Sequence, residues 1–156
     1  MSQGLLGDVL RDQGNLPRAL DAYRVGLDIQ KRLAQADPSN TTAQRNVSVS
    51  HDRVGDMLCD QGDLAGALAE YRASLTITER LAAQDSANAQ WQTDLARSCD
   101  RVAEALLALP EGDRAEARRL VARGLERMEA LAQAHPPTPY EQQMRARLEA
   151  LREQAG

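Results

Sequence analysis

The stretch Asp60-Gln61-Gly62-Asp63-Leu64 decides the fold, because the sequence contains it twice. The earlier copy, Asp12-Gln13-Gly14-Asn15-Leu16, lies 48 residues upstream. Residues 10–37 and 58–85 are identical at 15 of 28 aligned positions, where unrelated sequences would match at about two or three. We therefore expect a repeat protein, with units of about 1–37, 38–85 and 86–135 and a closing helix at 138–155.

Composition points to an all-helical protein. The chain of 156 residues is 42% hydrophobic, has no Phe, and is rich in the helix formers Ala, Leu, Arg, Glu and Gln. Its net charge of −4 comes without a Lys- or Arg-rich run, which argues against nucleic-acid binding. No apolar run reaches the length of a signal peptide core or a membrane span, so we expect a cytoplasmic protein that does not bind membranes.

Helix boundaries follow from breakers and caps. Gly14, Gly62 and Gly112 should end the first helix of each unit, and Thr138 with Glu141 forms a capping-box pattern before the last helix. The expected helices are 1–13, 15–36, 41–59, 63–84, 89–109, one after Gly112, and 139–154.

The third unit departs from the other two. It follows the second at an offset of 50 instead of 48, with Arg114 in place of Leu64 and Val121 in place of Tyr71. These exchanges predict a weaker apolar contact between its two helices.

Small and aromatic positions within each unit resemble those of the tetratricopeptide repeat (TPR) family. Small residues let paired helices approach closely, which offsets the cost of a glycine inside a helix. The positions in the first two units are Gly7, Gly14, Asn15, Leu16, Ala19, Tyr23 and Gly26, then Gly55, Gly62, Asp63, Leu64, Ala67, Tyr71 and Ser74.

The resemblance implies a right-handed α-solenoid of antiparallel helix pairs, a single domain over 1–156 with a C-terminal capping helix. The family's unit is about 34 residues, so the period of 48 resembles a long-helix bacterial type. Residues 41–48 have no counterpart before residue 1, so we expect either a fragment or a shortened member of a longer array.

The resemblance also implies where a partner would bind. In this family the first helix of each unit lines the concave face, and matching positions give Asp8, Arg11, Asp12, Asp52, Arg53, Asp56, Asp60, Arg97, Asp100, Arg101 and Glu104. Acids predominate, so we expect a partner protein or peptide of basic or mixed charge. The alternative is that these charges pair with one another between neighbouring helices and only stabilise the fold.

Two other functions are open to such a chain. Leu5, Leu6 and Val9 would leave an apolar end exposed, and this could drive self-association into a homo-oligomer. An enzyme is the third hypothesis, but the sequence has no catalytic, cofactor-binding or metal-binding constellation. His51 is interpreted as a packed side chain, and Cys59 and Cys99 as reduced thiols.

Overall fold

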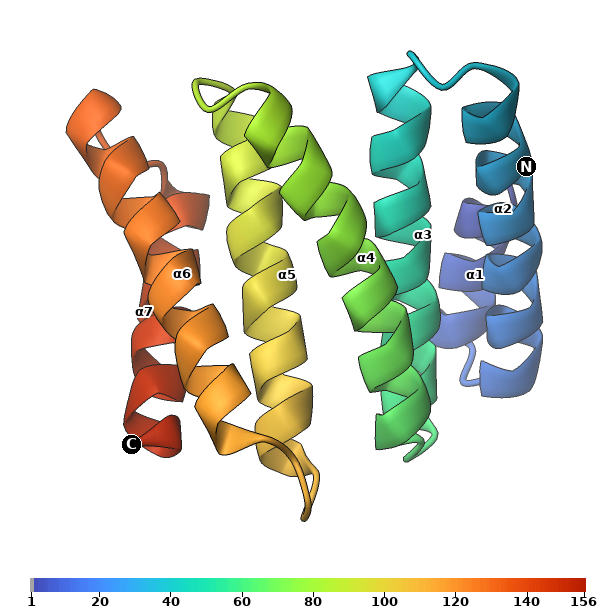
Figure 1. Ribbon diagram of the computed structural model, residues 1–156. Helices are drawn as coiled ribbons and strands as arrows, with labels where there is room; N and C mark the ends of the chain where they lie inside the picture. Colours follow the sequence, from blue (N-terminus) through green and yellow to red (C-terminus); the bar gives the residue numbers. More distant parts are fainter. Residues whose placement is uncertain (1) are drawn as a thin grey trace. The chain divides into compact units, whose positions relative to one another are not determined.

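The computed structural model describes residues 2–156, which form helices joined by short loops (Figure 1). The helices within these residues are α1 (Gln3–Asp12), α2 (Leu16–Ala36), α3 (Thr41–Asp60), α4 (Leu64–Gln84), α5 (Ala89–Ala108), α6 (Arg114–Ala134) and α7 (Pro139–Ala155). Residues 2–156 contain no strand. The all-α prediction is confirmed, and the helix bounds lie within one or two residues of the expected ones.

The residue before each helix explains where that helix begins. An amide of the first helical turn has no partner within the helix, and a side-chain oxygen of the preceding residue can accept its hydrogen bond. Asn40 accepts from the amide of Ala43 at 3.0 Å, and Asn88 accepts from that of Trp91 at 3.1 Å. Thr138 and Glu141 form the predicted capping box at α7.

Two glycines explain where α1 and α3 end. Gly14 has a φ of +76° and Gly62 a φ of +84°. This left-handed region is costly for residues with a side chain, so glycine is the residue that turns the chain there.

The chain forms two compact units, Met1–Ile77 (unit 1) and Thr78–Gly156 (unit 2), and the boundary falls inside α4. The single-domain interpretation stays a prediction. Within each unit, successive helices run in opposite directions, as Figure 1 shows.

In unit 1, α2 packs on both α1 and α3. Its buried residues recur at helical spacing and include Ala19, Tyr23 and Leu27, while Val54 and Met57 of α3 are fully buried. The core of unit 1 therefore lies on both sides of α2.

In unit 2, α5, α6 and α7 pack against one another in all three pairs. Their shared core is a cluster of Ala96, Met128, Leu131, Met144 and Leu148. The guanidinium groups of Arg114 and Arg118 donate to the last carbonyls of α7, those of Gln154 and Ala155, each at 3.0 Å. The closing helix α7 is therefore held by apolar packing along its length and by these hydrogen bonds at its C-terminal end.

The weaker apolar contact predicted for the third repeat stays a prediction, although its two helices bury one of the exchanged positions. Val121 is fully buried, and so is Ala103, which stands in α5 where the earlier repeats have Gly7 and Gly55. The smaller aliphatic side chain on α6 is matched by a larger residue on α5, so the two helices remain closely packed.

None of the helices described is both long enough and apolar enough to cross a membrane.

Candidate functional site

The candidate site begins with the acidic residues of the first helices. In unit 1, two of these acids, Asp8 and Asp56, each accept a hydrogen bond from a tyrosine of the second helix. A Cβ at Gly55 would lie 2.6 Å from the Tyr71 ring, so only glycine admits the tyrosine there. The hydroxyl of Tyr71 then reaches Asp56 and donates to its Oδ1 at 2.7 Å. The same arrangement joins Tyr23 to Asp8 at 2.6 Å.

These hydrogen bonds bring a phenol and a carboxylate into a half-buried site. Burial, followed by the hydrogen bond to Asp8, raises the pKa of Tyr23 to about 12. Tyr23 is therefore a hydrogen-bond donor at neutral pH, and it holds the Asp8 carboxylate in one orientation.

Two arginines complete the charged surface of unit 1. Arg53 lies 3.8 Å from the second oxygen of Asp8, and its guanidinium carbon is 5.9 Å from the centre of the Tyr23 ring. Arg11 approaches Asp60 at 3.4 Å, with side chains 47% and 39% exposed. Arg11 and Asp60 therefore join α1 and α3 at the surface.

Unit 2 uses its acids differently. Asp100 is 2% exposed, and its Oδ2 accepts from Nε of Arg147 on α7 at 3.1 Å. The Nη2 of Arg147 also donates to Glu104 at 3.2 Å. Burial raises the pKa of Asp100 and the Arg147 charge opposes that rise, while Asp100 raises the pKa of Arg147.

The eleven residues predicted from sequence differ in their access to solvent. Asp52 and Asp100 are buried, with exposed fractions of 4% and 2%, so they are not accessible to a partner in this conformation. The other nine are fully or partly exposed: Asp8, Arg11, Asp12, Arg53, Asp56, Asp60, Arg97, Arg101 and Glu104. Several pair with one another, as the structural alternative expected, so the accessible charged surface is smaller than the sequence predicts.

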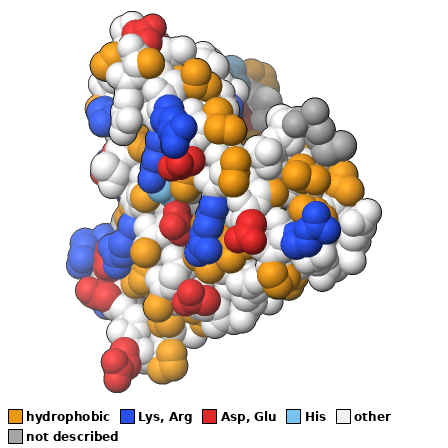
Figure 2. Space-filling model, turned by 90° about the vertical axis from the view of Figure 1, so that its right-hand side faces the viewer, with side chains coloured by type: hydrophobic (Ala, Val, Ile, Leu, Met, Phe, Trp, Pro, Cys, Tyr) orange, Lys and Arg blue, Asp and Glu red, His pale blue; other side chains and the backbone are white. Residues whose placement is uncertain are grey.

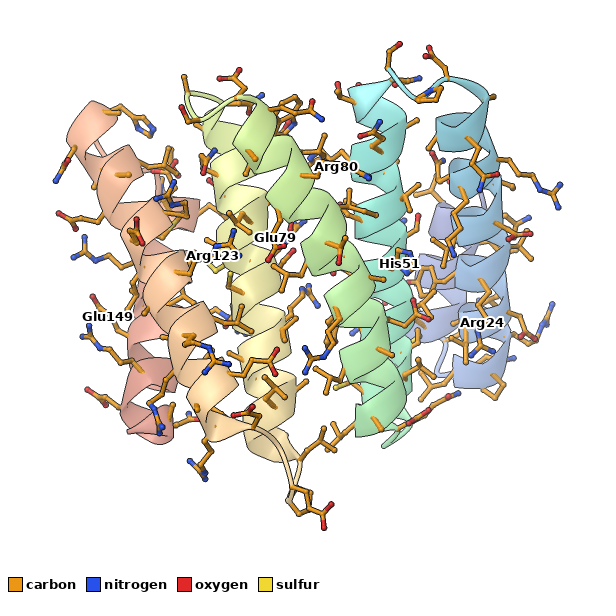
Figure 3. The ribbon with its side chains drawn as sticks, in the orientation of Figure 1. Arg24, His51, Glu79, Arg80, Arg123 and Glu149 are labelled. Atoms are coloured by element: carbon orange, nitrogen blue, oxygen red, sulfur yellow. The ribbon has the colours of Figure 1, made fainter. Side chains whose placement is uncertain are left out.

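One polar pair escaped the sequence argument. His51 is 8% exposed and lies between α3 and α4 (Figure 3), where its Nδ1 is 2.6 Å from Oε2 of Glu70. The hydrogen bond to His51 lowers the pKa of Glu70. His51 is packed, as predicted. A buried histidine also needs a polar partner, and this requirement is the sequence signal from which such a partner could have been expected.

A second ion pair lies on the second helices of unit 2. Arg123 of α6 and Glu79 of α4 point toward each other in Figure 3, with Nη1 2.6 Å from Oε1. Both side chains are more than one third exposed, so the pair contributes little to stability. Within residues 2–156, no group of three or more His, Cys, Asp or Glu side chains could hold a metal ion.

Comparison with known proteins agrees with the repeat pattern. A family model described as tetratricopeptide repeat matches residues 1–39 and 52–88, which include α1 and α2 of the first repeat, residues 52–60 of α3 and all of α4. A search among curated proteins gives no significant match.

Proposed function

Because this chain belongs to the tetratricopeptide repeat family, we propose that it is a non-enzymatic scaffold whose first helices bind a segment of another protein on the concave face. Tetratricopeptide repeats generally mediate protein–protein interactions. The finer elements of the proposal are the face, the charge of the partner and the residues that contact it.

The charge preference rests on one observation, the binding of Arg147 by Asp100 and Glu104. These two acids are four residues apart on α5, so they lie on one face of the helix. Together they bind a guanidinium group that comes from another helix. The same spacing occurs at Asp8 and Asp12 on α1, which supports a partner of basic or mixed charge.

Solvent access narrows the contact residues. Among the contact residues predicted for unit 1, the exposed ones are Asp12, Asp60 and Arg11, at the C-terminal ends of α1 and α3. In unit 2, Glu104 keeps a 60% exposed side chain although it accepts from Arg147. These four carry the proposal better than the buried Asp52 and Asp100.

A capture experiment tests the proposal with matched charge changes. The variant Asp12→Lys/Asp60→Lys reverses two exposed acids on the first helices, and Asp21→Lys/Asp28→Lys reverses two exposed acids on α2. We expect wild type and the α2 variant to retain a protein with a basic segment from cell lysate, and the first variant to lose it while keeping its helical circular dichroism. If both variants retain the same proteins, the partner binds elsewhere.

Self-association is a second candidate, favoured by the apolar side chains that α1 and α2 expose. Leu5 is 58% exposed and Val9 43%, and Val25, Ile29 and Leu33 form a row on α2 at intervals of four residues. Figure 2 shows hydrophobic side chains among charged ones on this side of the molecule. A mass by light scattering that stays monomeric at high concentration would remove this candidate.

A further inference from the structure

Two cations of unit 1 lie on the second helices without an ion-pair partner. Arg24 and Lys31 of α2 are both exposed, and neither makes a hydrogen bond or an ion pair within residues 2–156. Asp28 stands between them in the sequence, but it pairs with Arg32 at 3.5 Å. The positive charge of Arg24 and Lys31 is therefore available at the surface of α2.

The acid that α4 places near these cations is already engaged. Oε2 of Glu70 lies 2.6 Å from Nδ1 of His51, which Figure 3 shows between α3 and α4. The hydrogen bond with His51, and then the charges of Lys31 and Arg24, lower the pKa of Glu70. Glu70 therefore shows that this part of α4 lies beside the two cations, although it forms an ion pair with neither.

In unit 2 the equivalent place is closed by an internal ion pair. Glu79 is the counterpart of Lys31, 48 residues downstream, and Arg123 is the counterpart of Ala73, 50 residues downstream. Glu79 and Arg123 join α4 to α6 with Nη1 2.6 Å from Oε1 (Figure 3). Unit 1 has a lysine and an alanine at these two positions, so its neighbouring second helix supplies no counter-charge for Lys31.

The alanine also leaves room for a side chain from outside. Arg123 reaches from α6 to the acid of the neighbouring helix, whereas Ala73 ends at its Cβ. Ile77 follows Ala73 by one helical turn, and both are half-buried. A partner can therefore place an acidic side chain where unit 2 has the arginine, and an aliphatic one against Ile77.

The spacing of the two cations indicates the conformation of the partner. Arg24 and Lys31 are two helical turns apart, which is about 10.5 Å along α2. Acids two turns apart on a second helix repeat at the same distance. In an extended chain, side chains of one face recur at about 6.6 and 13 Å, so two acids there would not match both cations.

We propose that the α2–α4 surface, formed by Arg24, Lys31, Ala73 and Ile77, binds a helix of a partner protein that carries two acidic side chains two turns apart. Arg24 and Lys31 each bind one carboxylate, and an aliphatic residue between the acids contacts Ile77. Exposed ion pairs are weak by themselves, so the apolar contact is part of the recognition. This goes beyond the concave-face proposal, because it uses other helices and a partner of opposite charge.

Nuclear magnetic resonance with a helical probe tests the assignment. The probe is a blocked, alanine-rich peptide of at least about 15 residues, because shorter helices are marginal in water. It carries two glutamates at the spacing of Arg24 and Lys31 and a leucine between them on the same face. We expect saturable shifts of the Arg24 side-chain N–H and of the Ala73 and Ile77 methyl groups.

Three comparison ligands test the charge and the spacing. One peptide has glutamine in place of both glutamates, a second has its second glutamate moved two residues along and so off the face, and the third ligand is inorganic phosphate. We expect weaker binding of all three. The net charge of −4 disfavours acidic peptides in general, so preference for the glutamate peptide reports a local site.

Two variants test the residues. Arg24→Gln/Lys31→Gln should bind the glutamate peptide about tenfold more weakly, the loss expected for two exposed ion pairs. Lys31→Glu/Ala73→Arg installs the pair found at 79 and 123, so it should fold and close the surface internally. We expect it to lose the peptide as well.

Arg80→Gln/Arg119→Gln is the matched control, because it removes two exposed arginines elsewhere on the second helices and should bind as wild type does. Equal loss in this control, equal binding of the glutamine peptide or of phosphate, normal binding by Lys31→Glu/Ala73→Arg, or no shift at millimolar peptide would each overturn the assignment. None of these results bears on the acidic surface of the first helices, which the Asp12→Lys/Asp60→Lys variant tests separately.

Discussion

Unit 1 and unit 2 place an acid at the same position of their first helices and use it in opposite ways. In unit 1, Asp8 and Asp56 each accept a hydrogen bond from a tyrosine fifteen residues later, at 2.6 and 2.7 Å. In unit 2 the corresponding acid is Glu104, which is 60% exposed and accepts from an arginine on α7. The same position thus orients a helix pair in one unit and holds the closing helix in the other.

The difference arises from three positions that change together. Unit 1 combines a glycine, an aspartate and a tyrosine at 55, 56 and 71, whereas unit 2 has Ala103, Glu104 and Val121. Without a tyrosine hydroxyl to bind, the longer glutamate side chain is available to Arg147. The role of an acid on a first helix is therefore set by the second helix that packs beside it.

The largest expected effect comes from breaking the glycine–tyrosine contact. Gly55→Ala places a Cβ 2.6 Å from the buried Tyr71 ring, and we expect the free energy of unfolding to fall by about 2 kcal/mol. Adding Tyr71→Val recreates the combination of Ala103 and Val121. Denaturant titration should show the double variant destabilised by about 1 kcal/mol less than the sum of the single changes; strict additivity would mean that the two positions are independent.

A smaller effect is expected at the arginine of unit 2. Arg147→Ala leaves Asp100 buried without its guanidinium partner and should cost about 1.5 kcal/mol at neutral pH, a value reduced because Arg147 is 55% exposed. The pKa of Asp100 is already raised by burial, so the stability that its neutral form provides is full below about pH 4 and is lost as the pH rises through the raised pKa.

Removing Arg147 raises that pKa further. The deficit of Arg147→Ala relative to wild type should therefore be smaller at about pH 4 than at neutral pH, as measured by denaturant titration at both values. A deficit independent of pH would show that Asp100 is not the group affected.

The smallest effect concerns the tyrosine hydroxyls of unit 1. Tyr23→Phe removes the donor to Asp8 and should lower the free energy of unfolding by about 1 kcal/mol, because the hydrogen bond is only partly buried. Tyr71→Phe should behave alike. Tyr140→Phe is the matched control, since Tyr140 is 46% exposed and should tolerate the change. If Tyr23→Phe is as stable as wild type, Asp8 is held by Arg53 alone.

Much of the fold could be predicted because its determinants are local. Asn40 and Asn88 mark helix starts by their own side chains, and Gly14 and Gly62 mark helix ends by a φ that glycine tolerates. The period of 48 then identifies equivalent elements without any knowledge of tertiary contacts.

The candidate site was less predictable because its contacts join distant residues. The sequence shows that Asp52 and Asp100 recur, but their burial depends on neighbouring helices, and the partner of Asp100 comes from 47 residues downstream.

The cap at the start of α5 has a spectroscopic consequence. The amide bonded to Asn88 belongs to Trp91, the single tryptophan of the chain, and it lies in unit 2. Tryptophan fluorescence therefore reports unfolding of unit 2, whereas circular dichroism reports the helices of both units. A melting curve recorded with both signals would separate the two units without any added label: coincident transitions would mean that they unfold together, and displaced ones would give each unit its own melting temperature.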